Sequence, residues 1–298
     1  MTAVLAGTSG MAGTSGMAGT GGMTETAFGG LLREWRRRRR LTQLDLGNKA
    51  EVSARHLSFL ETGRSRPSRD MVLHLAEQLD LPLRTRNELL MAAGFAPGYT
   101  QHPLEAAEMG EVHRSLNRLL AAHDPFPAVL VDGQWDMIDG NAASALFVEL
   151  ADPALLTPPV NVLRVSLHPR GLARYVADLH EYAAHLVSRL RRQVDRSADP
   201  ALGALLDELV GYCRELGLDP SAHPRNRVVL PLRLRHPDGE LTFFSTISVL
   251  GAPLDVTLDE VAVESFFPAD VTTADYLHHR FAGRARTWEP TDDKEHPG

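Results

Sequence analysis

The residues whose types and spacing best suit a specific chemistry lie in two short segments, 42–50 and 53–61. Each segment carries apolar residues at helical spacing, and Thr42 and Ser53 are hydroxyl residues of the kind that cap helix N-termini. The second segment would present small and polar side chains, among them Arg55, on its outer face. Two short helices joined by a tight turn, with such a face on the second, suit the major groove of duplex DNA.

The elements that must position these helices extend over residues 28–94, where apolar residues recur at intervals of three and four. This periodicity predicts five short helices packed around one small core. The first helix ends in the arginine run 36–40, and the segment 62–68 predicts a loop with a glycine at a helix C-terminus. The fourth helix would begin at about Arg69, and the fifth would cover about residues 84–93.

The charge of the chain changes sign along its length. The whole chain has a net charge of −7, but residues 24–100 hold 13 Lys and Arg against 9 Asp and Glu, a local charge of +4. Residues 101–298 hold 18 Lys and Arg against 29 Asp and Glu, a local charge of −11. A basic module joined to an acidic one is typical of a protein with a nucleic-acid-binding part. A run such as 36–40 is most often only a solvated surface, so charge alone leaves a purely structural helical bundle open.

The segment from about residue 28 to residue 80 resembles the repressor/Cro-like helix-turn-helix family, also called the XRE family. The resemblance rests on Leu41-Thr42-Gln43, on Val52-Ser53, and on Glu61-Thr62-Gly63-Arg64 followed by Pro67. It implies a set of residues that contact DNA: Gln43, Ser53, Ala54, Arg55, His56, Ser58, Arg64 and Arg66. The partner would be a double-stranded DNA operator, bound by a homodimer because one recognition helix buries too little surface for tight specific binding.

Roles within this set follow from the resemblance and agree with the chemistry of the side chains. Gln43 is expected to donate its amide to a DNA phosphate, and Arg64 and Arg66 are expected to contact phosphates beside the third helix. Arg55 can bond O6 and N7 of guanine, and Ala54 can touch a thymine methyl group.

The resemblance also implies a structural salt bridge between Arg36 and Glu61, which would fix the third helix against the first. Two positions depart from the family pattern. Glu51 stands where the family usually has glycine, because the backbone there tends toward positive φ, and we expect a cost of about 1 kcal/mol. Gly47 replaces the usual alanine, which keeps room for the third helix but lowers helix propensity.

The rest of the chain predicts an α+β multidomain protein, in which an α/β domain follows the all-α five-helix domain. A hinge and a linker helix near 112–122 come first, and two amphipathic helices are expected over 172–190 and 202–213. The turn Asp132-Gly133 predicts a hairpin between the first two strands. Five strands are expected: 128–131, 135–138, 228–235, 241–250 and 261–266.

Residues 127–280 resemble the MmyB-like ligand-binding domain that follows this helix-turn-helix in many bacterial regulators, and the fold looks PAS-like. The resemblance implies a half-open sheet with helices around an apolar cavity, which holds a fatty acid or another small apolar effector; no other cofactor is expected. The matching motifs are Trp135-Asp136, Asn141-Ala142-Ala143, Asn161-Val162-Leu163-Arg164 and Glu264-Ser265-Phe266-Phe267-Pro268-Ala269-Asp270.

The candidate pocket residues are apolar or aromatic side chains on the predicted helices and strands: Met137, Phe147, Tyr175, Leu179, Tyr182, Phe244 and Ile247. Apolar residues at such spacing are more often core than ligand contacts. Two hypotheses therefore stay open. The C-terminal domain senses a ligand, or it is a dimerisation or protein-docking module in a ligand-independent regulator.

Catalytic and metal-binding sites find no support in the sequence. The segment His180-Glu181-Tyr182-Ala183-Ala184-His185 has one residue too many for the zinc-protease signature, which puts its imidazoles roughly 140° apart on a helix. The single cysteine, Cys213, excludes an intrachain disulfide and lies in an apolar helical stripe. We expect no enzyme activity, with an enzyme fused to a DNA-binding domain as a remote alternative.

No apolar run approaches the roughly 20 residues that span a bilayer, and the N-terminus lacks the pattern of a signal peptide. The expected location is the cytoplasm, at the nucleoid, without a membrane partner. The predicted divisions are a disordered low-complexity leader at 1–23, a DNA-binding domain at 24–97, a hinge and linker helix at 98–126, a ligand-binding domain at 127–284 and a disordered tail at 285–298.

Overall fold

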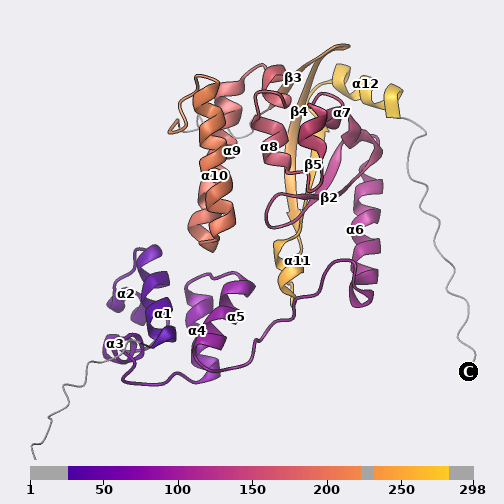
Figure 1. Ribbon diagram of the computed structural model, residues 1–298. Helices are drawn as coiled ribbons and strands as arrows, with labels where there is room; N and C mark the ends of the chain where they lie inside the picture. Colours follow the sequence, from indigo (N-terminus) through magenta and orange to yellow (C-terminus); the bar gives the residue numbers. More distant parts are fainter. Residues whose placement is uncertain (1–25, 223–230, 282–298) are drawn as a thin grey trace, which may run out of the picture.

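The computed structural model describes residues 26–222 and 231–281, which form an N-terminal helical part and a C-terminal α/β part (Figure 1). The predicted leader 1–23 and tail 285–298 lie outside the described residues, as do the first three residues of the strand predicted over 228–235. Within the described segments, no helix combines the length and the apolar character needed to cross a membrane.

Five helices form the N-terminal part: α1 (Ala27–Arg38), α2 (Gln43–Lys49), α3 (Ala54–Glu61), α4 (Arg69–Gln78) and α5 (Leu83–Ala92). The hydroxyl groups of Thr26, Thr42, Ser53 and Ser68 accept hydrogen bonds from the first turns of α1 to α4. Local sequence therefore fixes where these helices begin. Apolar side chains from all five bury one core, which includes Leu32, Leu46, Leu57, Leu60, Leu75 and Leu90.

Glycines allow two close helix contacts in this core. A Cβ atom on Gly29 of α1 would lie 2.5 Å from the backbone oxygen of Glu61, and one on Gly47 of α2 would lie 2.7 Å from that of Val52. An alanine at position 47 would therefore collide with the turn before α3. In that turn Glu51 has φ 53°, the positive value expected from the sequence.

A five-stranded antiparallel sheet forms the centre of the α/β part, in the order β2-β1-β5-β4-β3. The strands are β1 (Ala128–Val131), β2 (Met137–Gly140), β3 (Leu232–His236), β4 (Gly239–Val249) and β5 (Ala262–Pro268). The central strand β5 pairs with β1 on one side and with β4 on the other. Its side chains therefore face both layers of helices.

Helices cover the two faces of the sheet (Figure 1). The linker helix α6 (Gly110–Ala122) packs on one face, and α8 (Val162–Leu167), α9 (Leu179–Ser197) and α10 (Pro200–Glu215) lie on the other. Three further α-helices belong to this domain: α7 (Ala145–Val148), α11 (Val256–Glu260) and α12 (Val271–Phe281). This arrangement confirms the predicted α+β multidomain class, an all-α five-helix domain followed by a PAS-like α/β domain.

Two buried asparagines from the C-terminal motifs link these layers. Asn141 accepts a hydrogen bond from the Ala128 N–H at 2.9 Å and donates to the carbonyl oxygen of Phe126 at 2.7 Å. Asn161 donates to the Asp136 carboxylate at 2.9 Å. Because buried polar groups are stable only when hydrogen-bonded, these residues specify how the chain enters and leaves the first hairpin.

The loop of the first hairpin is longer than predicted. The second strand begins at Met137 and not at residue 135, because Trp135 adopts a left-handed backbone conformation with φ 67°. Its ring is buried, and its indole N–H donates to Gln193 of α9 at 2.7 Å. Packing of one aromatic side chain thus moves the start of the strand by two residues.

The prediction of one helix over 172–190 is wrong at the beginning of this range. Residues 172–175 form a separate 3₁₀ turn, Val176 makes a β-bridge with Leu234 of β3, and α9 begins at Leu179. Apolar spacing does not reveal this break, because the side chains on both sides of it are buried in neighbouring cores.

Gly29→Ala is expected to lower the free energy of unfolding by about 1–3 kcal/mol, because the new methyl group collides with the backbone of α3. The matched control is Gly211→Ala in α10, where nothing lies within 4 Å of the added Cβ atom. The free energy of unfolding of that variant should rise by up to about 1 kcal/mol, since alanine has a higher helix propensity than glycine. Denaturant unfolding of both full-length variants measures the difference, and an undiminished stability of Gly29→Ala would contradict the close packing of α1 on α3.

Candidate DNA interface and ligand cavity

The helix α3 presents an open outer face. Its inner side buries Leu57 and Leu60, whereas Arg55 is exposed and Ala54 and Ser58 are half-buried. Figure 1 shows α3 at the end of the molecule that lies away from the sheet. This helix has the exposure that contact with a DNA groove requires.

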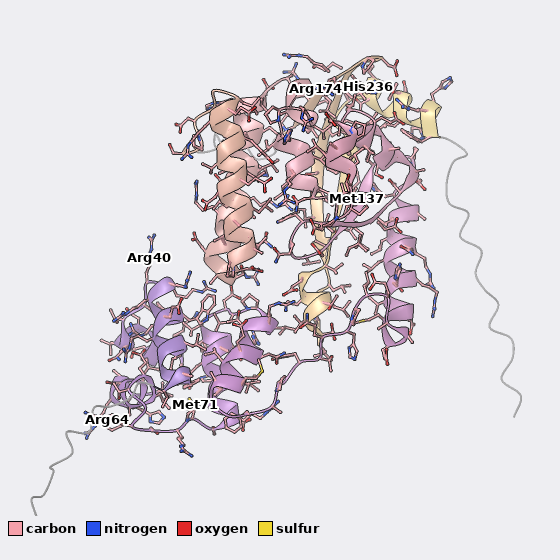
Figure 2. The ribbon with its side chains drawn as sticks, in the orientation of Figure 1. Arg40, Arg64, Met71, Met137, Arg174 and His236 are labelled. Atoms are coloured by element: carbon pink, nitrogen blue, oxygen red, sulfur yellow. The ribbon has the colours of Figure 1, made fainter. Side chains whose placement is uncertain are left out.

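The other predicted DNA contacts surround the same helix. Ser53 is exposed at its N-terminus, and His56 is half-buried in its first turn. Arg64 and Arg66 are exposed in the loop that follows, with Arg64 at the outer end of the domain (Figure 2). Gln43 is half-buried at the start of α2. The structure thus places all the predicted contact residues on α2, α3 and the adjoining loops.

Phe59 is a residue of this surface that the sequence reasoning missed. The guanidinium carbons of Arg55 and Arg64 lie 5.3 Å and 5.8 Å from the centre of its ring. Cation–π contact holds both arginines beside α3 and limits the side-chain freedom that each would lose on binding a partner. The spacing of Arg55 and Phe59, one helical turn apart, was the available signal.

Glu61, at the end of α3, is fully buried and accepts hydrogen bonds from two other helices. Arg36 of α1 donates through Nε and Nη2 to its two carboxylate oxygens, at 2.6 Å and 2.9 Å. Gln43 of α2 donates its amide to Oε2 at 2.9 Å. One carboxylate therefore ties α1 and α2 to the helix that faces outward.

The bond to Glu61 also bears on the role predicted for Gln43. An amide nitrogen carries two hydrogens, so a donation to Glu61 leaves one for a DNA phosphate. The internal bond fixes the orientation of the amide at the N-terminus of α2. The phosphate contact itself stays a prediction.

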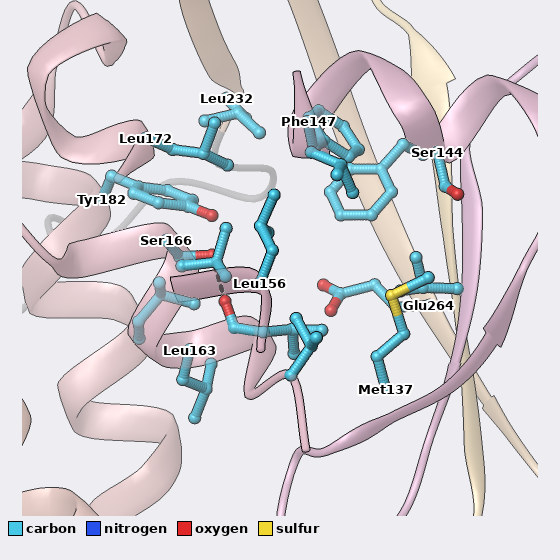
Figure 3. A pocket seen from close by; sticks show the side chains of 17 residues that line it. Met137, Ser144, Phe147, Leu156, Leu163, Ser166, Leu172, Tyr182, Leu232 and Glu264 are labelled. Atoms are coloured by element: carbon cyan, nitrogen blue, oxygen red, sulfur yellow. Dashed lines mark hydrogen bonds between the residues drawn. The ribbon is translucent and has the colours of Figure 1, made fainter. Parts of the chain in front are cut away.

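An apolar cavity of about 60 Å³ lies between the sheet and the helices α7 to α9 (Figure 3). Val129, Met137 and Phe266 line it from the sheet, while Leu163 and Leu186 line it from α8 and α9. Its walls thus come from segments far apart in the sequence. Figure 2 shows Met137 inside the α/β part.

Three of the seven side chains predicted for a pocket line this cavity: Met137, Phe147 and Tyr182. The other four lie elsewhere. Tyr175 and Leu179 pack in the neighbouring core. Phe244 lies on the opposite face of β4, stacked on Phe267 with ring centres 5.1 Å apart, because alternate strand residues face opposite sides. Ile247 lines a second cleft.

Polar groups enter the cavity from both walls. On the helix side, burial raises the pKa of the Tyr182 hydroxyl to about 12, so the phenol stays neutral. Ser166 donates its hydroxyl to the carbonyl oxygen of Val162 at 2.7 Å. On the sheet side, Glu264 of β5 lines the same space. A single acidic residue among the apolar residues of a central strand is the signal that points to Glu264.

The second cleft, of about 370 Å³, lies where the two parts of the chain meet. Trp135 and Ile247 line it from the α/β domain, and Pro82 lines it from the helical domain. Arg189 of α9 stacks its guanidinium 4.0 Å from the centre of the Trp135 ring and lies 3.4 Å from a carboxylate oxygen of Glu264. Arg189 thus stands between this cleft and the apolar cavity.

The short helix α11 joins the two domains through hydrogen bonds. The Asp259 carboxylate accepts from the N–H of Leu83, at the start of α5, at 3.1 Å. The Glu260 carboxylate accepts two bonds from Arg84, each 2.7 Å long. Strand β5 begins two residues after Glu260. The strand that carries Glu264 therefore follows directly after the helix that contacts the helical domain.

No group of three or more His, Cys, Asp or Glu side chains in residues 26–222 and 231–281 could hold a metal ion. Cys213 of α10 is buried in the core that this helix shares with α8 and α9, and burial raises the pKa of its thiol. A raised thiol pKa disfavours the reactive thiolate.

Glu61→Gln is expected to lower the free energy of unfolding by about 3 kcal/mol at neutral pH, because Arg36 loses its buried counter-charge. Burial raises the pKa of the Glu61 carboxyl, but the hydrogen bonds from Arg36 and Gln43 outweigh burial and hold the pKa below its ordinary 4.5. Such a carboxyl stabilises the fold fully above its unfolded-state pKa and loses this effect as the pH falls through the lower folded-state value.

The stability difference between wild type and Glu61→Gln should therefore shrink below pH 4.5. Denaturant unfolding at about pH 7 and about pH 3 measures it. The matched control is Glu34→Gln, which removes an exposed pair with Arg38 and should cost at most about 0.5 kcal/mol. An equal difference at both pH values would contradict the buried ion pair.

Comparison with protein families agrees with this geometry. The family model described as "MmyB-like transcription regulator ligand binding domain" matches residues 112–279, more than half of the chain. A second model, "Helix-turn-helix domain", matches residues 27–89, which include α1 to α4. Comparison with curated proteins gave no match.

Among solved structures, the chain is similar to one described as "Structure of an RNA-binding Light-Oxygen-Voltage Receptor", with 12% identity and a TM-score of 0.24. The match covers 87% of this chain and 64% of that one. So low a TM-score supports no conclusion about either fold. The two family matches confirm the XRE-like and MmyB-like resemblances seen in the sequence. The chain belongs to the MmyB-like transcription regulators, DNA-binding proteins with a helix-turn-helix domain before a ligand-binding domain.

Proposed function

We propose that this regulator binds a specific operator through α3 as a homodimer, and that a small apolar ligand in the cavity tunes this binding. The observation that best supports the proposal is the direct connection between cavity and DNA-binding domain through β5 and α11. Such a protein acts at the nucleoid, and its cytoplasmic location follows from that role.

Sequence-specific binding is supported by the chemistry of α3. Arg55, held on Phe59, has the donors for O6 and N7 of guanine, and Ala54 offers a methyl group to thymine. Arg64 and Arg66 supply charge for the phosphates on either side. Base contacts specify the sequence, whereas the phosphate contacts fix the position of the domain on the duplex.

A homodimer follows from the size of this surface. One eight-residue helix contacts too few base pairs for tight specific binding, whereas two copies related by a twofold axis would read a roughly palindromic operator. The half-sites would lie about one helical turn of DNA, or a multiple of it, apart.

The small size of the cavity means that a ligand would have to enlarge it. Its 60 Å³ is well below the roughly 150 Å³ of an engineered cavity that binds benzene. A fatty acid or another apolar effector must therefore displace lining side chains, and β5 forms one wall. A ligand regulates DNA binding only if it binds the competent and incompetent arrangements with different affinity. Expansion of the cavity supplies such a difference.

A ligand-independent regulator with a C-terminal dimerisation or docking module is the second candidate. It is favoured by the exposed apolar side chains of Val249 and Leu254 at the end of β4 and in the loop that follows it. Mass spectrometry of small molecules released from the purified protein separates the two. A stoichiometric apolar molecule supports the sensor, whereas an empty protein that octanol and octanoate do not stabilise against heat supports the docking module.

Arg55→Ala should weaken binding to the preferred operator by about 1–3 kcal/mol and relax the preference at one base pair, because a bidentate guanine contact is lost. Selection of duplexes from a random pool, followed by fluorescence anisotropy, measures both effects. Arg66→Ala should weaken all sequences alike, as expected for a phosphate contact. The remote control is Arg114→Ala on α6, which is exposed and should change neither quantity. An unaltered base preference in Arg55→Ala would contradict base recognition by this residue.

Arg84→Ala should uncouple the ligand from DNA, because it removes the bidentate ion pair between α5 and α11. In the wild type, saturating octanol or octanoate should change operator affinity at least about fivefold. In Arg84→Ala the ratio of operator affinities with and without the ligand should approach one, while the ligand still binds.

The matched control for this test is Arg233→Ala. Its side chain is 41% exposed, close to the 43% of Arg84, and it also pairs with a glutamate, Glu240 of β4. This variant should keep the wild-type ratio. If Arg84→Ala keeps the wild-type ratio of operator affinities with and without ligand, the signal does not pass through α11.

A further inference from the structure

Glu264 is the acidic residue among the side chains that line the apolar cavity. It lies on the central strand β5, beside Ile247 of β4, with 11% of its side chain exposed. Figure 3 shows its carboxylate pointing from the sheet into the cavity, toward the helix wall. Among residues 26–222 and 231–281, those that line the cavity include no Lys, Arg or His. A carboxylate that Arg189 contacts on one oxygen therefore faces a space whose other described lining residues are apolar or neutral polar.

The contacts of this carboxylate are uneven. Ser245 donates to Oε1 at 3.1 Å, and Arg189 donates to the same oxygen at 3.4 Å. Within the described residues, no donor bonds Oε2. Charge-assisted N–H···O bonds are usually about 2.7–2.9 Å long, so the Arg189 contact is also a long one.

A purely structural ion pair in this protein has a different geometry. Arg36 bonds both oxygens of Glu61, at 2.6 Å and 2.9 Å, and Gln43 adds a third donor. Glu264 instead keeps one oxygen without a donor from the described residues, and a ligand that donates a hydrogen bond can use this oxygen. Its position suits a carboxylate that receives its missing donor from a ligand.

The charge of Glu264 limits the head group that can bind beside it. A ligand carboxylate beside Glu264 would meet a like charge at close range, which disfavours two ionised groups. Arg189 already pairs with Glu264, and Tyr182 on the opposite wall is neutral, so neither of them offsets a second negative charge. A hydroxyl or amino group, in contrast, can donate directly to Oε2.

We propose that the ligand of this cavity is an apolar molecule with an O–H or N–H donor at its head, an alcohol or an amine, and that Oε2 of Glu264 accepts this hydrogen bond. The inference rests on the ligand-binding role proposed above. It departs from the free fatty acid expected from the family resemblance, because it makes Glu264 the residue that selects against a carboxylate head.

The test compares three probes with the same alkyl chain, octanol, octylamine and octanoate, by isothermal titration calorimetry on the full-length protein near neutral pH. Octanol and octylamine should each bind at least about tenfold more tightly than octanoate, the size expected when a hydrogen bond to a buried charge is replaced by repulsion. This comparison within the wild type requires no variant.

In Glu264→Gln the Kd of octanoate should exceed that of octanol by no more than about threefold, since the neutral amide repels neither head group. The matched control is Glu240→Gln, an exposed carboxylate in the same sheet, which should keep the wild-type ratio. Circular dichroism and thermal unfolding verify that each variant folds. If Glu264→Gln does not fold, the wild-type ratio decides alone.

The outcomes separate this inference from the proposed function. Octanoate binding to the wild type as tightly as octanol, or an unchanged ratio in Glu264→Gln, overturns the role of Glu264 but keeps the cavity as a ligand site. Failure of all three probes to bind overturns both the inference and the sensor proposal.

Discussion

A carboxylate that is removed from water must be held by hydrogen-bond donors, and this constraint governs both halves of the protein. Glu61 meets it completely within the protein, through Arg36 and Gln43, and so locks three helices into the arrangement that presents α3. Glu264 meets it only in part, through Ser245 and Arg189 on one oxygen. The first carboxylate stabilises the DNA-binding scaffold, whereas the second leaves the cavity with a defined chemical preference.

The connection between the halves uses elements that each have two functions. Strand β5 forms a wall of the cavity and continues into the ion-paired helix α11. Helix α9 lines the cavity through Leu186, and near its other end the backbone oxygen of Asp195 accepts a hydrogen bond from Arg39 of the helical domain at 3.0 Å. A change in cavity volume would therefore reach the DNA-binding domain by two routes, one ionic and one through the backbone.

Local chemistry made the N-terminal domain predictable from its sequence. Thr42 and Ser53 cap the helices that they precede, and Glu51 has the positive φ expected for its turn. The cavity was less predictable, because its walls come from separate segments, and the face on which Phe244 lies depends on strand register. Helix α11 has five residues, too few for a periodic pattern, and its partner Arg84 lies far away in the sequence. Glu264 appeared in the sequence only as part of a motif, since its role depends on the cavity that surrounds it.

Hydrogen–deuterium exchange of the full-length protein, with and without octanol, tests most directly whether the cavity communicates with the DNA-binding domain. The account predicts altered exchange in β5, in α11 and at the start of α5, with no change in the exposed turns of α6 on the opposite face of the sheet. Altered exchange only in the segments that line the cavity, with α11 and α5 unaffected, would contradict this account.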